Sequence, residues 1–232
     1  MSDVEAKVGE DAYVWVKSHS RELIEKFVNA QGCFPDPWPT TLFMAGSPGA
    51  GKTEISKRLL ARFKLQAIRI DADEIRAMCP GYSGANAHIF QKAATKGVHI
   101  LYDYALQKGI NVILDGTFAY GGALENIERS LNHKRKVELF FVYQDPAQAW
   151  EFTKKREEIE RRKVSKEVFV DSFIKARENV NKAKEHFGSK IELNLIVKDF
   201  EKDLEQLELN IDSIDPHIPK QYTGDELRNI LK

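Results

Sequence analysis

The chain has 232 residues, of which 42% are hydrophobic and 30% are charged, as in a soluble globular protein. Lys plus Arg and Asp plus Glu both number 35, so no basic excess points to nucleic acid or an anionic membrane as a partner. Cys33 and Cys79 lie far apart and indicate neither a disulfide framework nor a zinc site. No apolar run approaches the ~20 residues that span a bilayer, and the acidic start, residues 1–5, lacks a signal sequence, so we expect a cytoplasmic protein.

Taken in chain order, apolar residues at helical spacing predict one amphipathic helix over residues 10–30, and the prolines of residues 35–39 then form a connector. Short apolar runs predict five strands, over residues 41–45, 66–70, 111–114, 137–143 and 191–197. The intervening segments predict helices over residues 54–63, 85–108, a stretch ending at 131, a stretch starting at 145–146, and 166–187, with a last one capped by 223–226. This alternation predicts an α/β fold with a mostly parallel sheet of five strands and helices on both faces.

A glycine-rich loop joins the first predicted strand to the next helix. The pattern G-x-x-x-x-G-K-S/T is matched without exception by Gly46-Ser47-Pro48-Gly49-Ala50-Gly51-Lys52-Thr53. Glycines let backbone N–H groups surround a phosphate, and the following helix N-terminus adds partial positive charge. In such loops the lysine reaches the β- and γ-phosphates of ATP, and the hydroxyl after it binds Mg²⁺. The chain is therefore predicted to be a P-loop NTPase, with an N-terminal helix and connector (1–40), a core (41–200) and a C-terminal extension on the same domain (201–232).

Two further predicted strands end in acidic residues. Asp71 and Asp73 follow the second strand, and Asp115-Gly116-Thr117 follows the third. In a parallel α/β sheet, residues just past the carboxyl ends of strands line the ligand crevice. We therefore expect these carboxylates beside the phosphates, with Asp115 as a Walker-B-like ligand for Mg²⁺ together with Thr53.

A run rich in basic residues, 154–163, ends the helix that begins at Pro146. Such a run is usually a solvated helix face, and the glutamates 157, 158 and 160 favour that interpretation. Phosphoryl transfer, however, needs cations on the transferred group, and arginines on a lid over the site are a common source. We expect one or two of these arginines to serve that purpose.

The P-loop class can be narrowed from the sequence. A GTPase needs an N-K-x-D type element, and Asn181-Lys182-Ala183-Lys184 lacks the aspartate. A protein kinase uses a different glycine loop, and a helicase or motor is usually larger. A small-molecule kinase remains, and its acceptor hydroxyl needs a base close to the phosphate loop. Asp73, two residues past the second strand, is well placed for that role.

At this point the chain resembles the zeta-toxin family of P-loop kinases, from about residue 42 to about residue 200. The resemblance rests on an ordered set of motifs: the glycine loop 46–53, Ile70-Asp71-Ala72-Asp73-Glu74-Ile75-Arg76 with the later Pro80, Asp115-Gly116-Thr117, Arg156-Glu157, and Arg162 before Ser165-Lys166-Glu167. It implies transfer of the ATP γ-phosphoryl group to the 3′-hydroxyl of UDP-N-acetylglucosamine. It also implies a protein antitoxin as a partner.

Roles carry over to the positions that match. The resemblance implies that Lys52 and Thr53 bind the ATP phosphates and Mg²⁺, and that Asp73 is the general base. Asp115 stands where members commonly have glutamate, and Thr117 matches a threonine that helps to hold the substrate. Arg156 and Arg162 match two phosphate-stabilising arginines, with Arg161 as the local competitor of Arg162.

Two departures from the family pattern fall on the acceptor side. The long helix has His99 where members place a substrate-binding glutamate, and Ala119 stands where members often have arginine. A lone helical histidine is more often a structural residue than a ligand. Two alternatives therefore stay open: a kinase for a nucleoside, an antibiotic or another sugar nucleotide, and an ATP-binding regulator without a small-molecule acceptor. The first 35 or so residues are a structural brace or a segment that covers the nucleotide site.

Overall fold

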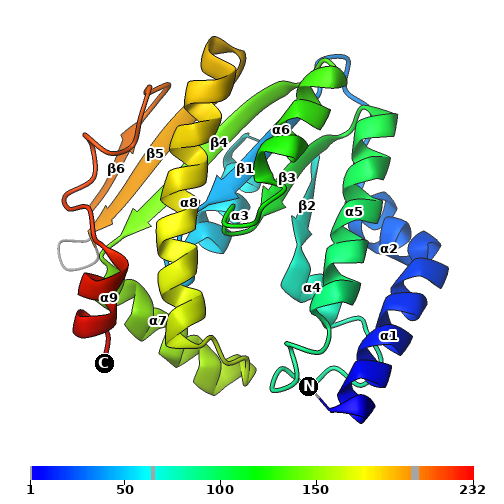
Figure 1. The fold of residues 1–232 in the computed structure, drawn as a ribbon. Coiled ribbons are helices and arrows are strands. Elements are labelled where there is room, and N and C mark those ends of the chain that lie inside the picture. Colours follow the sequence, from blue (N-terminus) through cyan, green and yellow to red (C-terminus); the bar gives the residue numbers. More distant parts are fainter. Residues whose placement is uncertain (1, 64–65, 200–203) are drawn as a thin grey trace.

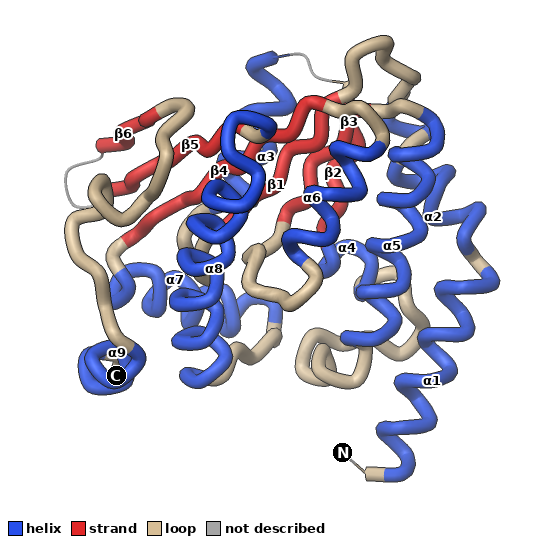
Figure 2. Tube along the Cα trace, turned by 45° about the horizontal axis from the view of Figure 1, so that its top comes forward, coloured by secondary structure: helices blue, strands red, loops and turns tan. Residues whose placement is uncertain are grey.

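The computed structural model describes residues 2–63, 66–199 and 204–232. One sheet runs through the molecule in the strand order β2-β3-β1-β4-β5-β6 (Figures 1 and 2). Its strands are β1 (Thr40–Ala45), β2 (Ala67–Asp71), β3 (Asn111–Asp115), β4 (Lys136–Gln144), β5 (Glu192–Asp199) and β6 (Leu204–Glu208). Strands β1 to β5 run parallel to one another, and β6 is antiparallel to β5. The predicted fold class is confirmed, with one antiparallel strand more than the five expected.

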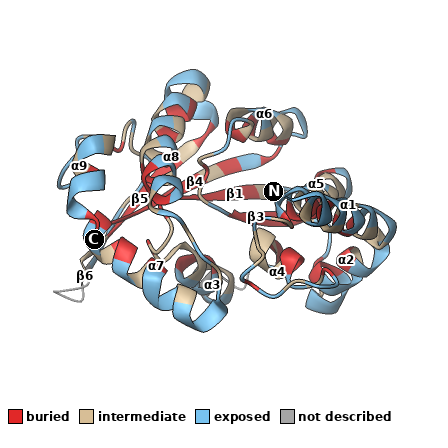
Figure 3. Ribbon diagram, turned by 60° about the horizontal axis from the view of Figure 1, so that its bottom comes forward, coloured by how far each residue is buried: buried red, intermediate tan, exposed pale blue. Residues whose placement is uncertain are grey.

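Helices cover both faces of this sheet. They are α1 (Asp3–Ser18), α2 (Ser20–Phe27), α3 (Lys52–Phe63), α4 (Ala72–Arg76), α5 (Gln91–Lys108), α6 (Ala123–Asn132), α7 (Pro146–Glu160), α8 (Lys166–Phe187) and α9 (Gly224–Ile230), with short 3-10 turns at Asn29–Gln31 and Gly188–Lys190. Figures 1 and 3 show α6 and α8 on one face and α3 on the other, while α1 and α2 lie outside α5 near the β2 edge. No helix of the described residues is long and apolar enough to cross a membrane.

Strand β1 shows why its sequence forms a buried central strand. Its side chains alternate between two apolar clusters, one on each side of the sheet. Leu42 and Met44 join the cluster under α3, and Phe43 and Ala45 join the larger cluster on the opposite face. A strand buried on both faces is continuously apolar, which is the pattern that identifies it in the sequence. The strand carries the glycine loop at its carboxyl end, so the loop starts from a rigid base.

Two helix predictions need correction. The helix predicted over residues 10–30 is two helices, α1 and α2, which meet at His19. Ser18 Oγ donates hydrogen bonds to the carbonyls of Val14 and Trp15, and the His19 ring stacks on Trp15 with centroids 4.4 Å apart. Local side chain to backbone bonds of this kind compete with helix propagation. The helix predicted over 85–108 begins later, at Gln91, because the residues before it form hydrogen-bonded turns.

Both ends of the chain pack against the core. At the amino end, Gly9 lets α1 come close to the turn before α5, since a Cβ there would lie 2.9 Å from the carbonyl oxygen of Ile89. At the other end, Trp150 Nε1 donates to the carbonyl oxygen of Lys232 at 2.7 Å, and Lys166 Nζ donates to that of Leu231 at 2.5 Å. These contacts fasten α9 to α7 and α8.

Candidate functional site

The glycine loop lies between β1 and α3, as the sequence predicts. Gly46 has φ 132° and Gly49 has φ 73°, both in the region that side chains rarely adopt. A Cβ on Gly46 would lie 2.4 Å from the carbonyl oxygen of Val142, and one on Gly49 would lie 2.0 Å from that of Ala149. Both glycines are therefore required by backbone angle and by space. The loop packs directly against β4 and α7, which bring further site residues to it.

Lys52 begins α3, and its side chain turns back over the loop. Its ammonium group donates to the carbonyl oxygen of Ser47 at 2.6 Å. Burial lowers the pKa of Lys52 from 10.5 to about 8, an effect that the nearby Asp115 only partly offsets and that Arg156 reinforces. A cation held in this way is stabilised by any anion that enters the loop. The arrangement fits a phosphate-binding lysine.

Two aspartates stand side by side at the carboxyl ends of β2 and β3. Asp71 and Asp115 are register partners, and one guanidinium group, that of Arg69, bridges them with contacts of 3.1 and 2.6 Å. Ser56 of α3 also donates to Asp115 Oδ2, at 2.8 Å. Asp71 in turn caps α4, because its Oδ1 accepts a bond from the N–H of Asp73 at 2.8 Å. These bonds fix the backbone that carries Asp73.

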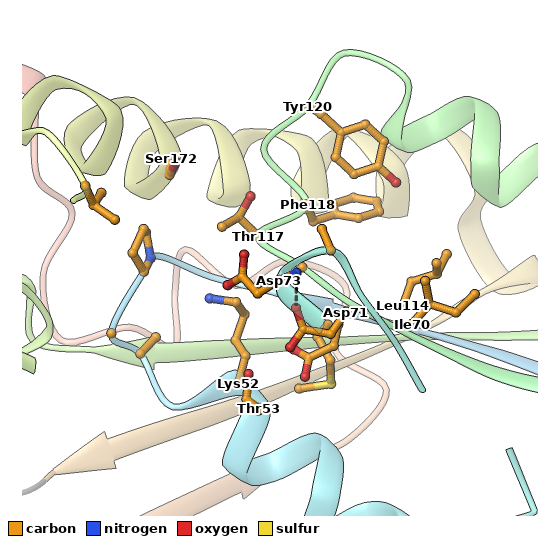
Figure 4. Close-up of a pocket in the computed structure, with 18 of the residues that line it drawn as sticks. Lys52, Thr53, Ile70, Asp71, Asp73, Leu114, Thr117, Phe118, Tyr120 and Ser172 are labelled. Atoms are coloured by element: carbon orange, nitrogen blue, oxygen red, sulfur yellow. Dashed lines mark hydrogen bonds between the residues drawn. The ribbon is translucent and has the colours of Figure 1, made fainter. Parts of the chain in front are cut away.

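The Asp73 carboxylate is surrounded by three arginines. Arg76, one turn further along α4, donates to Oδ1. Arg162 donates to Oδ2, and Arg156 Nη2 approaches the same oxygen at 3.4 Å. Figure 4 shows the side chain of Asp73 close to Lys52 and Thr117, in the same part of the cavity. A carboxylate, four cations and a phosphate loop thus converge on one place.

The segment between α7 and α8, residues 161–165, forms a lid that carries Arg162. Helix α7 ends at Glu160, and Arg161 follows it in the left-handed region with φ 59°. Of Arg161 and Arg162, the two arginines that the sequence offers for this position, Arg162 is the one that contacts Asp73. The backbone at Gly84 packs closely against the end of α7, where the lid begins, because a Cβ on Gly84 would lie 2.2 Å from the carbonyl oxygen of Glu160.

The glycine loop, Asp73 and the three arginines around it border one cavity of about 750 Å³. The sequence-predicted residues on its wall are Pro48, Gly49, Ala50, Gly51, Lys52, Thr53, Asp73, His99, Asp115, Thr117, Arg156 and Arg162. Gly46 and Ser47 shape the loop but do not border the cavity. His99 reaches the wall from α5. No described residue before Phe43 borders the cavity, so α1 and α2 do not cover it in this structure.

Arg76 and Arg69 were not identified as site residues from the sequence. Arg76 is buried, with 4% of its surface exposed, and donates to Gln91 Oε1 as well as to Asp73. Burial lowers its pKa, and the neighbouring Asp73 acts in the opposite direction. Its spacing of three residues from Asp73, one helical turn, was the available signal. Arg69 offered a similar signal as a charged residue between Ile68 and Ile70 in a buried strand.

The residues present fit a magnesium ion held mainly by a nucleotide. Among the described residues there is no group of three His, Cys, Asp or Glu side chains able to hold a metal on its own. Mg²⁺ usually keeps several waters and takes one or two protein oxygens in addition to substrate phosphates. The hydroxyl of Thr53 and the carboxylate of Asp115 on the cavity wall supply oxygens of that kind.

Comparisons with known proteins agree with this geometry. No curated protein matches the chain. Among solved structures, a chain of the PezAT chromosomal toxin-antitoxin system of Streptococcus pneumoniae covers 100% of this chain and 88% of its own, with a TM-score of 0.63 and 18% identity. The AvrRxo1-ORF1:AvrRxo1-ORF2 complex with sulphate ions covers 91% and 70% (TM-score 0.59, 15% identity), and the same pair with ATP covers 89% and 67% (0.59, 16%). At these identities the likeness shows a shared fold.

The family model named Zeta toxin matches residues 9–204, which include every predicted site residue. The resemblance drawn from the glycine loop, the Asp71–Arg76 segment and the lid arginines is thereby confirmed. This chain belongs to the zeta toxin family.

Proposed function

We propose that this protein is an ATP-dependent small-molecule kinase, and that its acceptor is the 3′-hydroxyl of UDP-N-acetylglucosamine. One observation carries the proposal: the Asp73 carboxylate lies among Arg76, Arg156 and Arg162, beside a phosphate loop and its lysine. A base for a hydroxyl and cations for a transferred phosphoryl group are what phosphotransfer requires. Family membership supports the kinase class.

The donor is held by the glycine loop and by the first turn of α3. Backbone N–H groups of the loop bind the phosphates, and the Lys52 ammonium moves from the Ser47 carbonyl to the β- and γ-phosphates. Thr53 and Asp115 would hold the Mg²⁺ that accompanies ATP, and the bound ion would supply positive charge next to the phosphates.

The two oxygens of the Asp73 carboxylate have different hydrogen-bond partners, and these partners indicate a different role for each oxygen. Arg76 stays on Oδ1 and keeps the group oriented. Arg162 and Arg156 share Oδ2, and both are long, flexible side chains, the first from the lid and the second from α7. When the γ-phosphate enters, these two guanidinium groups exchange the carboxylate for phosphate oxygens. Oδ2 then accepts the proton of the attacking hydroxyl as the phosphoryl group is transferred in line.

The acceptor is held on the far side of Asp73 from the loop. Thr117, His99, Tyr120 and Asn126 are polar residues of the cavity wall that come from outside the glycine loop, namely from α5, from α6 and from the segment between β3 and α6. His99 on the cavity wall, and Ala119 between the wall residues Phe118 and Tyr120, depart from the family pattern. These departures favour a second candidate: a kinase of the same mechanism for a nucleoside, an antibiotic or another sugar nucleotide.

The experiment is incubation of the protein with γ-labelled ATP and Mg²⁺ and a panel of UDP-sugars, nucleosides and antibiotics, with products identified by mass. We expect a gain of one phosphoryl group on UDP-N-acetylglucosamine, and a much slower gain when the Asp73→Asn variant is used. Phosphorylation of another compound alone would show that UDP-N-acetylglucosamine is not the acceptor, while the proposed kinase activity would stand. ATP consumption with no phosphorylated acceptor, together with a stable protein complex, would favour an ATP-binding regulator.

A protein antitoxin is the partner that we propose. The PezAT structure describes a toxin-antitoxin system, and AvrRxo1-ORF1 is bound to a second protein, AvrRxo1-ORF2. We propose the cytoplasm as the location, where ATP and sugar nucleotides are present. Co-expression of the chain with a neighbouring reading frame, read as rescue of growth and as a co-purified complex, tests this partner.

A further inference from the structure

The cavity has two sides, divided by the strand that carries the glycine loop. Strand β1 lies between β3 and β4 in the sheet. Asp73 follows β2 and Asp115 ends β3 on one side, while Gln144 and Lys198 stand at the ends of β4 and β5 on the other. Lys198 on β5 is therefore separated from the proposed base Asp73, which follows β2, by the strands β3, β1 and β4.

In-line transfer assigns a ligand to each side. The attacking hydroxyl and the leaving oxygen lie on opposite sides of the transferred phosphorus atom. Because the base Asp73 marks the side of the hydroxyl, the rest of the donor nucleotide extends away from it, toward β4 and β5. Among the described residues that line the cavity, Lys198 is the cation that lies on β5 itself, whereas Arg156 and Arg162, which follow β4 in the chain, reach to Asp73.

Lys198 already lies against the loop. A Cβ on Gly51 would be 2.9 Å from its Nζ, so the ammonium group is close to the backbone that surrounds the phosphates. Its side chain is 17% exposed, and Nζ contacts Glu54 Oε2 at 2.7 Å. Glu54 itself is 58% exposed and also approaches Arg58 at 3.8 Å. Lys198 is thus held at the mouth of the nucleotide side by a carboxylate that is free to turn to solvent.

We infer that Lys198 binds the α-phosphate of the donor nucleotide, and that Glu54 holds its ammonium group in position until the nucleotide arrives. The inference rests on the proposed ATP site. Lys52 serves the β- and γ-phosphates at the inner end of the loop. Lys198 supplies a second charge-assisted bond at the outer end, and it exchanges one anion for another when it does so.

The test measures ADP affinity by calorimetry for the wild type and three variants. Lys198→Gln is expected to weaken ADP binding about tenfold, the loss of one hydrogen bond to a charged group. Glu54→Gln removes the competing carboxylate and a negative charge next to the phosphates, so it is expected to strengthen binding about twofold to fivefold. Lys57→Gln, at an exposed lysine of α3 outside the cavity, is the matched control and should leave the affinity unchanged.

The two variants are expected to change ADP affinity in opposite directions, and this distinguishes a role of Lys198 in binding from a purely structural role. Lys198→Gln and Glu54→Gln break the same ion pair, so a purely structural role would shift ADP affinity in one direction for both. Equal affinity of the wild type and Lys198→Gln, or weaker binding by both variants, would overturn the inference while the ATP site stands. A wild-type protein that binds neither ADP nor ATP would overturn the proposed function as well.

Discussion

Nucleotide binding to this protein should take up a proton in mildly alkaline solution. Without a nucleotide, burial lowers the pKa of Lys52 from 10.5 to about 8, so the side chain is largely neutral above that pH. Phosphates beside the ammonium group favour its charged form and raise the pKa again. The complex then holds more protons at Lys52 than the free protein does, and affinity must fall as the pH rises through the lower pKa.

The size of the effect follows from the two pKa values. If the complex restores the ordinary value, uptake is about 0.1 proton at pH 7, about 0.5 at pH 8 and about 0.9 at pH 9. The affinity for ADP should fall about fivefold from pH 8 to pH 9 for the same reason. The phosphates of ADP do not contribute to this change, because their last pKa lies near pH 6.

The assay is calorimetric titration with ADP in pairs of buffers that differ in ionisation enthalpy, at pH 7, 8 and 9. The difference in observed heat divided by the difference in buffer enthalpy gives the protons taken up. Lys52→Arg is the control, because arginine keeps its charge over this range and should show no uptake. Zero uptake by the wild type at pH 9, or the same uptake by the arginine variant, would refute the assignment of the proton to Lys52.

Four substitutions test the rest of the site. Asp73→Asn should lower turnover on the order of 10²-fold to 10⁴-fold while ADP still binds, and initial rates equal to the wild type would remove Asp73 as the base. Arg76→Met should lower the free energy of unfolding by about 2 kcal/mol in urea, because Asp73 loses a buried partner but keeps the lid arginines; an unchanged urea midpoint would contradict this. Arg162→Ala should reduce turnover on the order of 10³-fold while the matched Arg161→Ala changes it less than about twofold, and equal losses would contradict the lid assignment. Gly84→Ala, at φ 81° and 2.2 Å from the Glu160 carbonyl oxygen, should lower the melting temperature by several degrees, and an unaltered melting curve would show that the lid yields.

The parts of the fold that the sequence predicts are those with strong apolar patterns. Strand β1 is apolar on both faces, and its run of residues 41–45 is sufficient to identify it. Strand β6 has the sequence Leu-Glu-Gln-Leu-Glu and lies at the edge of the sheet, so its pairing comes from the backbone of β5 rather than from buried side chains. The break at His19 was likewise invisible, because it depends on bonds that Ser18 and His19 make to the turn before them.

The site divides in a similar way. Asp73 and Arg162 were predicted because each belongs to a motif with a known chemical purpose and a fixed position after a strand or a helix. Arg76 was missed because its role depends on burial and on Gln91, fifteen residues away at the start of α5. Periodicity locates elements, whereas the partners of a buried charge are decided by how those elements pack.

The charges around the cavity indicate how it can bind phosphates although its wall carries no excess of positive charge. The described residues on its wall include five cations and five carboxylates: Lys52, Arg76, Arg156, Arg162 and Lys198, and Glu54, Asp71, Asp73, Asp115 and Glu160. Four of these cations donate to carboxylates, and three of them, Arg156, Arg162 and Lys198, can exchange a carboxylate oxygen for a phosphate oxygen at little electrostatic cost.

Lys52 differs from those four cations, because it donates to a neutral carbonyl oxygen, that of Ser47, rather than to a carboxylate. It is also the lysine whose pKa burial lowers to about 8. A buried ammonium group without a paired anion gains the most when an anion arrives. Because cations and carboxylates balance on its wall, the cavity as a whole does not favour anions. At Lys52, within the glycine loop, a bound phosphate is strongly favoured.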